Sequence, residues 1–318
     1  MLKLAVIGGG IMGERLVRAA AALPDLVEIV SVWDVLAEAS SRLAAVQPGL
    51  AVAASAAAAM RAADCVYIAT PPASHLGYAE TAIGMGKAVF CEKPLAVDLA
   101  AACTFLGRHK RARMAVNFPF ASSLAVAKLS EWMAGIGAAQ SLTIDVAFRT
   151  WPRPWQQDAA GWLDRRREGG FTREVVSHFL FLARRLLGPL ELGVDTIVQY
   201  PDGGRSEYDI RAQLKAGGVP VALTGNVGMV PKDDHNVWTL RAAHGSVRLR
   251  DWSIAELQGA DGKFHPDPDA MPNEQSRPLV LRRQLEEVAK LTRGEKHRLA
   301  TASEALDVME IVEAILAA

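Results

Sequence analysis

The chain lacks the features that would assign it to several large classes of protein. Its 318 residues include only three cysteines, which are too few for a disulfide framework and do not have the paired spacing of a zinc site. We expect Cys65, Cys91 and Cys103 to be reduced and mostly buried, and we expect no metal site. Lysine plus arginine and aspartate plus glutamate each number 35, so no net field attracts nucleic acid or an anionic membrane.

Long hydrophobic runs are also missing. No apolar stretch approaches the ~18 residues of a membrane span. The first residues, Met1 to Lys3, lead into a short strand pattern and do not have the charged head and longer apolar segment of a secretory signal. We therefore expect a cytoplasmic protein without a membrane partner. With 50% hydrophobic and 22% charged residues, the chain has ample material for packed cores, and its length suits two domains.

The first third of the chain alternates short apolar strands with helical patterns. This alternation predicts an α/β fold with a Rossmann-type, doubly wound parallel sheet that has helices on both faces. The expected strands cover 2–7, 27–33, 65–69, 88–91 and 114–117, and the expected helices cover 11–22, 35–46, 55–63, 74–84 and 97–109. The rhythm changes near residue 118. We predict a dinucleotide-binding domain over 1–118 and a substrate-binding and oligomerisation domain over 119–318.

In the second part the strands follow one another without crossover helices. We expect them at 141–149, 192–200, 207–216, 219–230 and 237–244, the last continuing through 247–249. Expected helices cover 122–134, 170–187, 284–292 and 303–316. This succession predicts a C-terminal α+β domain with an open, mostly antiparallel sheet. Because one face of such a sheet is available for association, we expect a homo-oligomer, either a dimer or a tetramer.

A glycine loop follows the first expected strand. Gly8, Gly10 and Gly13 have the spacing of the dinucleotide fingerprint and open a helix. The first glycine permits the tight turn, the second lets the backbone approach a pyrophosphate, and the third lets helix and strand pack closely. Ile11 and Met12 complete this loop, where free amide groups at the helix N-terminus would bind phosphates. The motif predicts a dinucleotide site.

Asp34 ends the second expected strand, 21 residues after Gly13. An acidic side chain at this place would accept hydrogen bonds from the adenosine ribose hydroxyls. Its charge would repel a 2'-phosphate, and Val35 and Leu36 supply no arginine to compensate. We therefore predict NAD as the cofactor, in preference to NADP. A helix-capping aspartate is the alternative interpretation.

Two further segments lie where later strands of the same sheet should end. Cys91-Glu92-Lys93-Pro94 places a lysine near the expected nicotinamide, which together with the glycine loop suggests a redox enzyme. Thr70, Pro71 and His75 follow another strand at the sheet edge where open parallel sheets bind ligands. We expect all three to line the cofactor site, although His75 could equally be an ordinary helix-start residue and Lys93 a solvated loop residue.

These segments resemble the Gfo/Idh/MocA oxidoreductases, named for glucose-fructose oxidoreductase, inositol dehydrogenase and a rhizopine-catabolism protein. The matching segments are 6–13, 67–72 with His75, 86–95, and 168–170 leading to Glu174 and His178. The likeness is specific in the first third of the chain and looser beyond it. It implies that Lys93 hydrogen-bonds the reacting oxygen beside the nicotinamide and that His178 exchanges the proton that accompanies hydride transfer. Glu92 would hold the loop or the ribose.

Glu174 stands where members of this family often have aspartate. Residues 174 and 178 are four apart, so on one helix they share a face, and the carboxylate could orient the ring or hold a substrate hydroxyl. A histidine with an unperturbed pKa near ~6.5 can exchange a proton at neutral pH. We therefore assign Lys93, His178 and Glu174 to catalysis. A salt-bridged helical pair without chemistry is the alternative for Glu174 and His178.

Some residues depart from the family pattern. Phe181 stands where many relatives carry aspartate, and the segment 117–120 lacks the arginine or tyrosine often found there, so the pocket would be less polar. Trp151, Trp155 and Trp162 could cover a sugar-like ring or pack between other elements.

The leading hypothesis is an NAD(H)-dependent oxidoreductase that transfers hydride between nicotinamide and a carbinol or carbonyl carbon of a small polar substrate, sugar- or cyclitol-like. One alternative is a reductase of imines or conjugated double bonds. Another is a dinucleotide-sensing regulator without turnover, because fold does not fix function.

Overall fold

The computed structural model describes residues 1–231 and 234–318, which divide into two compact units. The first unit contains Met1–Pro119 and Pro278–Leu306, and the second contains Phe120–Arg277 and Asp307–Ala318. The sequence pattern assigns residues 278–306 to the second domain, whereas the structure packs them in the first unit. This assignment depends on contacts between residues that are distant in sequence, and a local sequence pattern gives no information about such contacts.

The first unit is built on a six-stranded sheet with the order β14-β5-β4-β3-β1-β2. Its strands are β1 (Leu2–Ile7), β2 (Val27–Trp33), β3 (Cys65–Ile68), β4 (Ala88–Glu92), β5 (Met114–Asn117) and β14 (Ala300–Thr301). Strands β1 to β5 pair in parallel. All residues of β3, β4 and β5 are buried, as expected of a parallel sheet that is covered on both faces.

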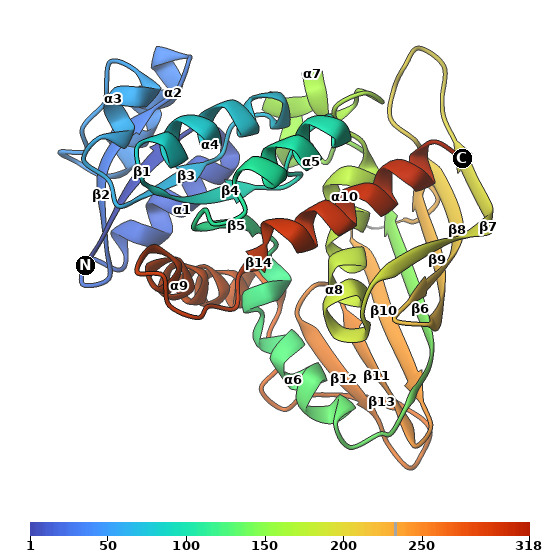
Figure 1. The fold of residues 1–318 in the computed structure, drawn as a ribbon. Helices are drawn as coiled ribbons and strands as arrows, with labels where there is room; N and C mark the ends of the chain where they lie inside the picture. The colour runs from blue at the N-terminus through green and yellow to red at the C-terminus, as the bar shows by residue number, and fades with distance from the viewer. Residues whose placement is uncertain (232–233) are drawn as a thin grey trace. The chain divides into compact units, whose positions relative to one another are not determined.

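Helices cover both faces of this sheet (Figure 1). They are α1 (Ile11–Ala21), α2 (Ala37–Val46), α3 (Ala56–Met60), α4 (His75–Gly84), α5 (Leu99–Arg108) and α9 (Asn273–Thr292). Leu16 and Val17 of α1 share one hydrophobic cluster with Leu285 and Val288 of α9, so these two helices cover the same face. Figure 1 shows α4 and α5 on the other face. The Rossmann-type prediction is confirmed.

Two features of the first unit were not visible in the sequence. Strand β14 has only two residues and pairs antiparallel with β5. The sequence pattern indicates β5 as the last strand of this sheet. Helix α9 begins at Asn273, before the expected 284, and contains Pro278. A proline normally marks a helix boundary, because it removes a backbone donor and clashes with the preceding turn. Here it is the sixth residue of the helix, so α9 continues through a position where the sequence indicates a boundary.

The second unit contains an eight-stranded sheet with the order β13-β12-β11-β10-β6-β9-β8-β7. Its strands are β6 (Ala139–Phe148), β7 (Leu190–Gln199), β8 (Asp209–Ala216), β9 (Val219–Val227), β10 (His235–Ala242), β11 (Gly245–Arg250), β12 (Ile254–Gln258) and β13 (Phe264–Pro266). Only the β6–β9 pair among these described strands is parallel, and the others are antiparallel. The predicted open, mostly antiparallel sheet is confirmed.

Two of the strands in this sheet form a hairpin where the sequence suggested one continuous run. Strands β10 and β11 pair as Ala242↔Gly245, so a two-residue turn separates them. Strands β12 and β13 follow as further antiparallel neighbours that the sequence pattern did not indicate. They are short, at five and three residues, and so give little periodicity to detect.

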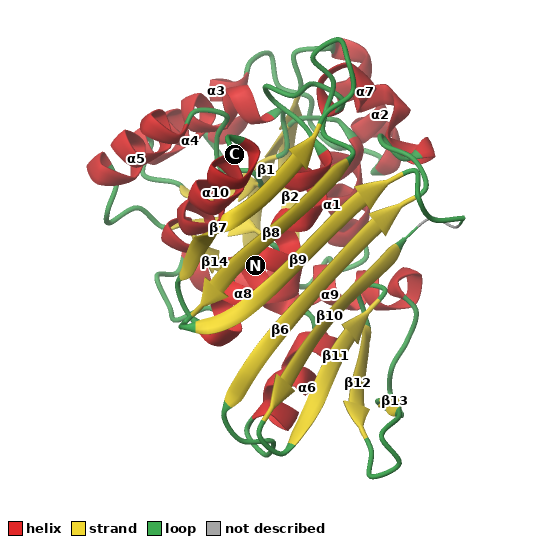
Figure 2. Ribbon diagram, turned by 90° about the vertical axis from the view of Figure 1, so that its right-hand side faces the viewer, coloured by secondary structure: helices red, strands yellow, loops and turns green. Residues whose placement is uncertain are grey.

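The helices of the second unit lie on one face of this sheet (Figure 2). They include α6 (Leu124–Met133), α7 (Ala160–Leu163), a π-helical turn at Thr172–Val176 and α8 (Ser177–Leu187). Helix α8 contacts β7 and β8, and α6 contacts β11 and β12. The side of the sheet that faces the viewer in Figure 2 carries none of the helices described for this unit.

Helix α8 is the most enclosed helix segment of the second unit. Every residue from Ser177 to Ala183 is buried, and the helix ends at Gly188, whose φ of +123° suits glycine. Helix α10 (Ala302–Leu316) supplies Asp307, which pairs with Arg184 at 2.8 Å. This burial fixes the orientation of any functional side chain on α8.

Candidate active site

The glycine loop is closely packed at two of its three glycines. Gly8 has a φ of +108°, and a Cβ there would lie 2.5 Å from the backbone carbonyl of Ala69. A Cβ at Gly13 would lie 2.0 Å from the carbonyl oxygen of Gly8. At Gly10 none of the described atoms lies within 4 Å of the Cβ position. Gly8 and Gly13 are therefore required by the backbone packing, and Gly10 leaves open space in front of α1.

The N-terminus of α1 opens onto that space. Gly10 is the N-cap residue and provides no side-chain hydrogen bond to the first turn, which begins with Ile11 and Met12. Amide groups in the first turn of a helix have no intrahelical partner, and the helix dipole adds positive potential there. The arrangement can hold an anionic group such as a pyrophosphate.

Asp34 is fixed next to the glycine loop. Its Oδ2 accepts a hydrogen bond from the backbone amide of Gly9 at 2.6 Å, and its Oδ1 accepts one from Leu36 at 2.8 Å. Its own amide donates to Oγ of Ser40 at 2.8 Å. A carboxylate has about four acceptor positions, so Asp34 keeps capacity for a further donor. Asp34 thus stabilises a local turn and also lies where a ribose-binding acid is expected.

His75 connects two loops at the carboxyl edge of the sheet. Its Nδ1 lies 2.8 Å from the carbonyl oxygen of Pro94, and its Nε2 lies 2.8 Å from that of Thr70. The residue is 1% exposed. Both ring nitrogens are therefore engaged with backbone carbonyls, and the ring offers neither of them to a cofactor. The ring joins the loops at Thr70 and Pro94, and its contact with a cofactor stays a prediction.

Burial determines the protonation of His75. Two carbonyl acceptors favour the imidazolium form, which donates from both nitrogens. Desolvation is the larger effect and lowers the pKa of His75 below its usual 6.5. The neutral ring donates a hydrogen bond to one of the two carbonyl oxygens. Thr70 also receives the hydroxyl of Ser74, since the two side-chain oxygens lie 2.7 Å apart, and Pro71 is exposed beside them.

A buried polar network lies on the other side of Lys93. Oε1 of Glu92 accepts hydrogen bonds from the hydroxyl of Tyr67 and from Nδ2 of Asn117, the latter at 2.6 Å. Oδ1 of Asn117 in turn accepts a hydrogen bond from Gln284 of α9 at 2.5 Å. Burial, followed by the neighbouring carboxylate, raises the pKa of Tyr67 well above its usual value. The network ties the end of β4 to β3, β5 and α9, and it supports the loop-holding role expected of Glu92.

Tyr67, Asn117 and Gln284 were not identified as functional from the sequence. Tyr67 and Asn117 are polar residues within otherwise apolar strands, and this was the signal available. Buried polar groups need hydrogen-bond partners. Their partners come from three different elements, and no local pattern shows that these elements meet.

In the second unit, His178 lies on α8 and Glu174 lies in the preceding π-helical turn. His178 is 8% exposed. Its ring has edge-on contacts with Trp252 and Phe120, with centroid distances of 5.5 and 6.2 Å. The sequence predicts one regular helix over 170–187, whereas the structure has a π turn at Thr172–Val176. A π turn changes the angular separation between residues four apart, and such turns are frequent at functional sites.

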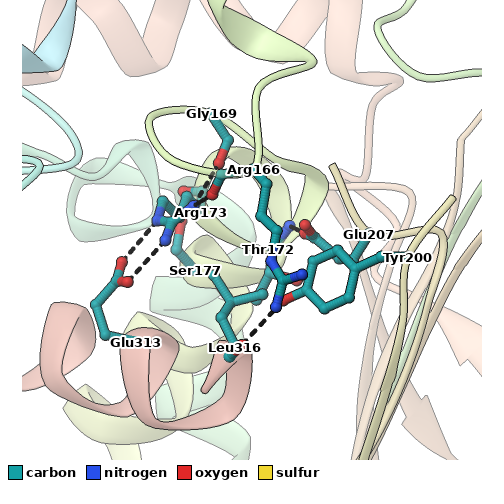
Figure 3. Close-up of polar contacts among 9 residues, drawn as sticks. All are labelled: Arg166, Gly169, Thr172, Arg173, Ser177, Tyr200, Glu207, Glu313 and Leu316. Carbon is teal, nitrogen blue, oxygen red and sulfur yellow. Dashed lines mark hydrogen bonds and ion pairs between the residues drawn. The ribbon is translucent and has the colours of Figure 1, made fainter. Parts of the chain in front are cut away.

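Arg173 anchors this π turn (Figure 3). Its Nε and Nη2 pair with the carboxylate of Glu313 on α10 at 2.6 and 2.7 Å. Its Nη1 donates to the carbonyl oxygens of Arg166 and Gly169 at 2.6 and 2.8 Å. Two parallel bonds between a guanidinium and a carboxylate fix both position and orientation. Arg173 therefore holds the backbone directly before Glu174.

A second carboxylate supports the start of the same turn. Oε1 of Glu207 accepts a hydrogen bond from the amide of Thr172 at 2.5 Å. Burial raises the pKa of Glu207 above its usual value. A Cβ on Gly170, whose φ is +112°, would lie 2.9 Å from Oε2 of Glu207. In Figure 3 Glu207 lies next to Tyr200, whose ring is 3.6 Å from the guanidinium of Arg166.

The tryptophan-containing segment packs against its own unit. Trp151 is buried, donates from Nε1 to the carbonyl oxygen of Leu163 at 3.2 Å, and contacts Phe171. Trp155 is 45% exposed, with the guanidinium of Arg153 4.5 Å from its ring. Trp151 is thus a packing residue.

The predicted site residues fall into two groups. The first unit brings the glycine loop, Asp34, Thr70, His75 and the Glu92–Lys93 loop to the carboxyl edge of one sheet. The second unit places Glu174 and His178 on one continuous helical segment. Lys93 and His178 belong to different units, and their proximity stays a prediction.

The described residues contain no group of three or more His, Cys, Asp or Glu that could hold a metal ion. In the same residues no helix is long and apolar enough to cross a membrane.

Comparison with known proteins places this geometry in a family. Residues 2–117 match the model of an oxidoreductase family with an NAD-binding Rossmann fold, Gfo/Idh/MocA. Residues 2–117 are therefore assigned to the Gfo/Idh/MocA oxidoreductase family. The family expected from the glycine loop and the Glu-Lys-Pro segment is therefore confirmed for this part of the chain, which has an NAD-binding Rossmann fold.

Two curated relatives match over short segments. Inositol 2-dehydrogenase of Cereibacter sphaeroides is 34% identical over 98 residues, which cover 30% of this chain and 29% of that protein. Oxidoreductase P35 of Formosa agariphila is 45% identical over 54 residues, 17% of each chain. The matched segments thus span less than a third of either relative.

Two solved structures resemble the fold over nearly the whole chain. A levoglucosan dehydrogenase in complex with NADH has a TM-score of 0.83 at 17% identity and covers 99% of this chain and 96% of its own. An oxidoreductase of Thermotoga maritima has a TM-score of 0.82 at 16% identity and covers 99% and 95%. At such identities the likeness describes the fold alone.

Proposed function

We propose that this Gfo/Idh/MocA protein is an NAD(H)-dependent enzyme that transfers hydride between nicotinamide and a carbinol or carbonyl carbon of a small polar, sugar- or cyclitol-like substrate. The observation that carries the proposal is the fixation of Lys93. Glu92 is held by Tyr67 and Asn117 on one side, and Pro94 faces His75 on the other. A structural network on both sides of one lysine is what a preorganised catalytic cation requires.

The cofactor assignment follows from the groups that would hold it. The open space at Gly10, the first-turn amides of α1 and the carboxylate of Asp34 fit a dinucleotide. The negative charge of Asp34, fixed beside the loop, disfavours a 2'-phosphate, so NAD is preferred to NADP. When bound, NAD supplies the carbon that accepts or returns hydride.

The residues of the chain would manage the charge and the proton. Lys93 donates a hydrogen bond to the substrate oxygen and stabilises the alkoxide that develops during oxidation. His178 accepts the proton of the substrate hydroxyl and returns it in the reverse reaction. Glu174 orients His178 or binds a second hydroxyl. The names of the relatives, inositol 2-dehydrogenase and levoglucosan dehydrogenase, support a polyhydroxylated substrate.

The test is a screen of cyclitols, pyranoses, hydroxy acids and imines with NAD and NADH, followed at the nicotinamide absorbance band. In the Lys93→Ala variant we expect kcat/KM to fall by about 100-fold or more, while the Kd for NAD changes little. Lys87→Ala is the matched control, because Lys87 lies at the opposite, N-terminal end of β4 and donates to the carbonyl oxygen of Arg61 at 2.9 Å. Full activity of Lys93→Ala would refute the mechanism.

A reductase of imines or conjugated double bonds is the second candidate. It is favoured by the apolar surroundings of His178, which contacts the rings of Phe120 and Trp252. Turnover of NADH with cyclic imines, together with inactivity toward every carbinol in the screen, would select this candidate. A sensor protein would bind NADH and turn over no substrate at all.

We also propose that the chain forms a homo-oligomer through the open face or the edge of the second unit's sheet. On the edge strand β7, Val194 and Ile197 are 98% and 54% exposed. Light scattering coupled to size exclusion would detect a dimer or tetramer, and a monomer at all concentrations would contradict the proposal.

A further inference from the structure

The turn between β11 and β12 has an unusual backbone. Asp251 has a φ of +48° and Trp252 a φ of +73°, so two successive non-glycine residues lie in the left-handed region. Aspartate tolerates this conformation, but a bulky aromatic residue is a genuine outlier there. Glycine or asparagine would form the same turn with less strain. The tryptophan must therefore be explained by where its ring lies.

Neighbouring groups hold the turn in place. The amide of Asp251 donates to the carbonyl oxygen of Asn236 at 2.9 Å, and its carboxylate accepts from Arg250 at 2.9 Å. The hydroxyl of Ser253 donates to the carbonyl oxygen of Met271 at 2.8 Å. A strained conformation persists when its surroundings determine it in this way, and such outliers cluster at functional sites.

The ring of Trp252 lies beside the imidazole of His178. Their centroids are 5.5 Å apart with planes at 77°, an edge-to-face contact. Phe179 and Phe120 also contact the Trp252 ring, at 5.1 and 5.7 Å. These four side chains form the aromatic cluster at His178.

Trp252 differs from a core tryptophan in its exposure. Trp238, on the neighbouring strand β10, is 0% exposed, whereas Trp252 remains partly exposed within the described residues. A tryptophan kept only for packing would be expected to bury its ring as Trp238 does. Ligand pockets, by contrast, are lined mainly by aromatic and apolar surfaces with a few polar groups that fix orientation.

We propose that Trp252 is a substrate-contacting residue that determines specificity for saturated rings. The inference rests on the proposed function and names its substrate class more narrowly. The indole face packs against the C–H face of a cyclic polyol, a pyranose or a cyclitol, while His178 receives the hydroxyl proton. An open-chain polyol presents no continuous C–H face and gains little from this contact.

The test compares Trp252→Ala, Trp252→Phe and Trp252→Gly in the full chain. The glycine variant removes the ring and also relieves the positive φ, so it keeps the turn even where alanine disturbs folding. Trp132→Ala is the control, because Trp132 is a partly exposed tryptophan on α6 whose ring lies 6.0 Å from the ammonium of Lys128. KM and kcat are measured for a cyclic polyol and for an open-chain polyol with the same number of hydroxyls.

We expect the alanine and glycine variants to raise KM for the cyclic polyol about tenfold or more, and phenylalanine to restore most of the affinity. KM for the open-chain polyol and the Kd for NADH should stay within about threefold. Equal effects on both polyols, or no effect on either, would overturn the proposal.

Binding separates this proposal from the proposed function. Saturation-transfer NMR of the same cyclic polyol with the NADH-loaded protein requires no turnover. If the wild type turns over nothing but binds the cyclic polyol, and Trp252→Gly loses that binding, the hydride-transfer proposal fails while the role of Trp252 is supported. If the wild type binds no cyclic polyol, or binds it as tightly without the ring, the role of Trp252 is overturned.

Discussion

The imidazole of His75 and the carbonyl oxygen of Pro94 lie 2.8 Å apart, so a buried ring holds the residue that follows Lys93. The other ring nitrogen contacts Thr70, at the edge where the glycine loop also ends. His75 is thus a positioning residue for two loops of the candidate site. The contact makes the lysine loop dependent on the protonation of a group that does not touch substrate.

The first prediction concerns His75 and pH. Because burial lowers its pKa below 6.5, the unfolded chain binds more protons at this site than the folded chain between the lowered pKa and 6.5. The stabilising contribution is therefore present above pH 6.5 and is lost as the pH falls below it. We expect the melting temperature of the wild type to decline on acidification, and that of His75→Gln to decline less steeply.

The His75→Gln variant also tests positioning. Glutamine can donate to one of the two carbonyls, so kcat should fall more than the Kd for NAD rises. His109→Gln is a suitable control, since His109 is a partly buried histidine at the end of α5 that pairs with Glu80 at 3.0 Å. Parallel acid slopes in His75→Gln and the wild type would contradict the assignment of this titration to His75.

The second prediction concerns the ion pair of Arg173 and Glu313. Replacing Glu313 by Gln leaves a buried guanidinium without its countercharge, and we expect a loss of about 1–3 kcal/mol in the free energy of unfolding. Arg173→Met should cost more, because the carbonyl oxygens of Arg166 and Gly169 lose their donor as well. Denaturant unfolding measures both effects.

A double-mutant cycle isolates the pair. The coupling between Arg173→Met and Glu313→Gln should be clearly favourable, whereas the same cycle on the more exposed pair of Arg184 and Asp307 should give under about 1 kcal/mol. Additive effects at Arg173 and Glu313 would show that the pair does not stabilise the π turn.

The third prediction concerns Glu207. Burial raises its pKa above 4.5, so the folded chain retains a proton that the unfolded chain releases. The associated stability is complete below pH 4.5 and is lost as the pH rises through the raised pKa. Glu207→Gln keeps an acceptor for Thr172 and removes the charge. We expect it to melt at a higher temperature than the wild type at neutral pH.

Glu256 offers the control for that experiment. It is also buried, at 5% exposure, but its carboxylate pairs with Arg250 at 3.0 Å. Glu256→Gln should therefore destabilise the chain at neutral pH. If Glu207→Gln melts at a lower temperature than the wild type at neutral pH, the charged carboxylate of Glu207 stabilises the folded chain and the prediction is wrong.

The fourth prediction concerns cofactor choice. Asp34→Asn retains a carbonyl oxygen for the amide of Gly9 and removes the negative charge. The ratio of kcat/KM for NADP to that for NAD should rise about tenfold or more. Ser40→Ala removes only the acceptor of the Asp34 amide and should leave this ratio unchanged. An unchanged ratio in Asp34→Asn would assign the selectivity to other groups.

The sequence predicted the parts of the molecule that depend on neighbouring residues. The glycine loop, the strand before Lys93 and the alternation of the first five strands follow from local spacing, so the fold class and the family were predictable. Strand β14, the π turn and the left-handed Trp252 were not. Each is set by a partner distant in sequence: β5 pairs with β14, Glu313 binds Arg173, and Asn236 holds Asp251.

The candidate site was predictable to a similar extent. Lys93, Glu174 and His178 were named from the family resemblance, and their roles remain proposals. The supporting residues were missed because their contacts cross elements, as when Gln284 reaches Asn117. The sequence places His75 at the sheet edge, but the two carbonyl oxygens that its ring contacts could not be predicted from local spacing.

The pairing of β14 with β5 has a consequence for synthesis on the ribosome. Ala300 pairs with Val116, and α9 covers one face of the same sheet, so the first unit needs residues that are translated long after its five parallel strands. Domains usually fold in order as they emerge from the ribosome. Here the nascent N-terminal sheet stays incomplete, with the edge of β5 unpaired, until Ala300 and Thr301 have been made. A chaperone that binds unpaired strand edges is therefore expected to associate with translation intermediates of this chain more than with the finished protein.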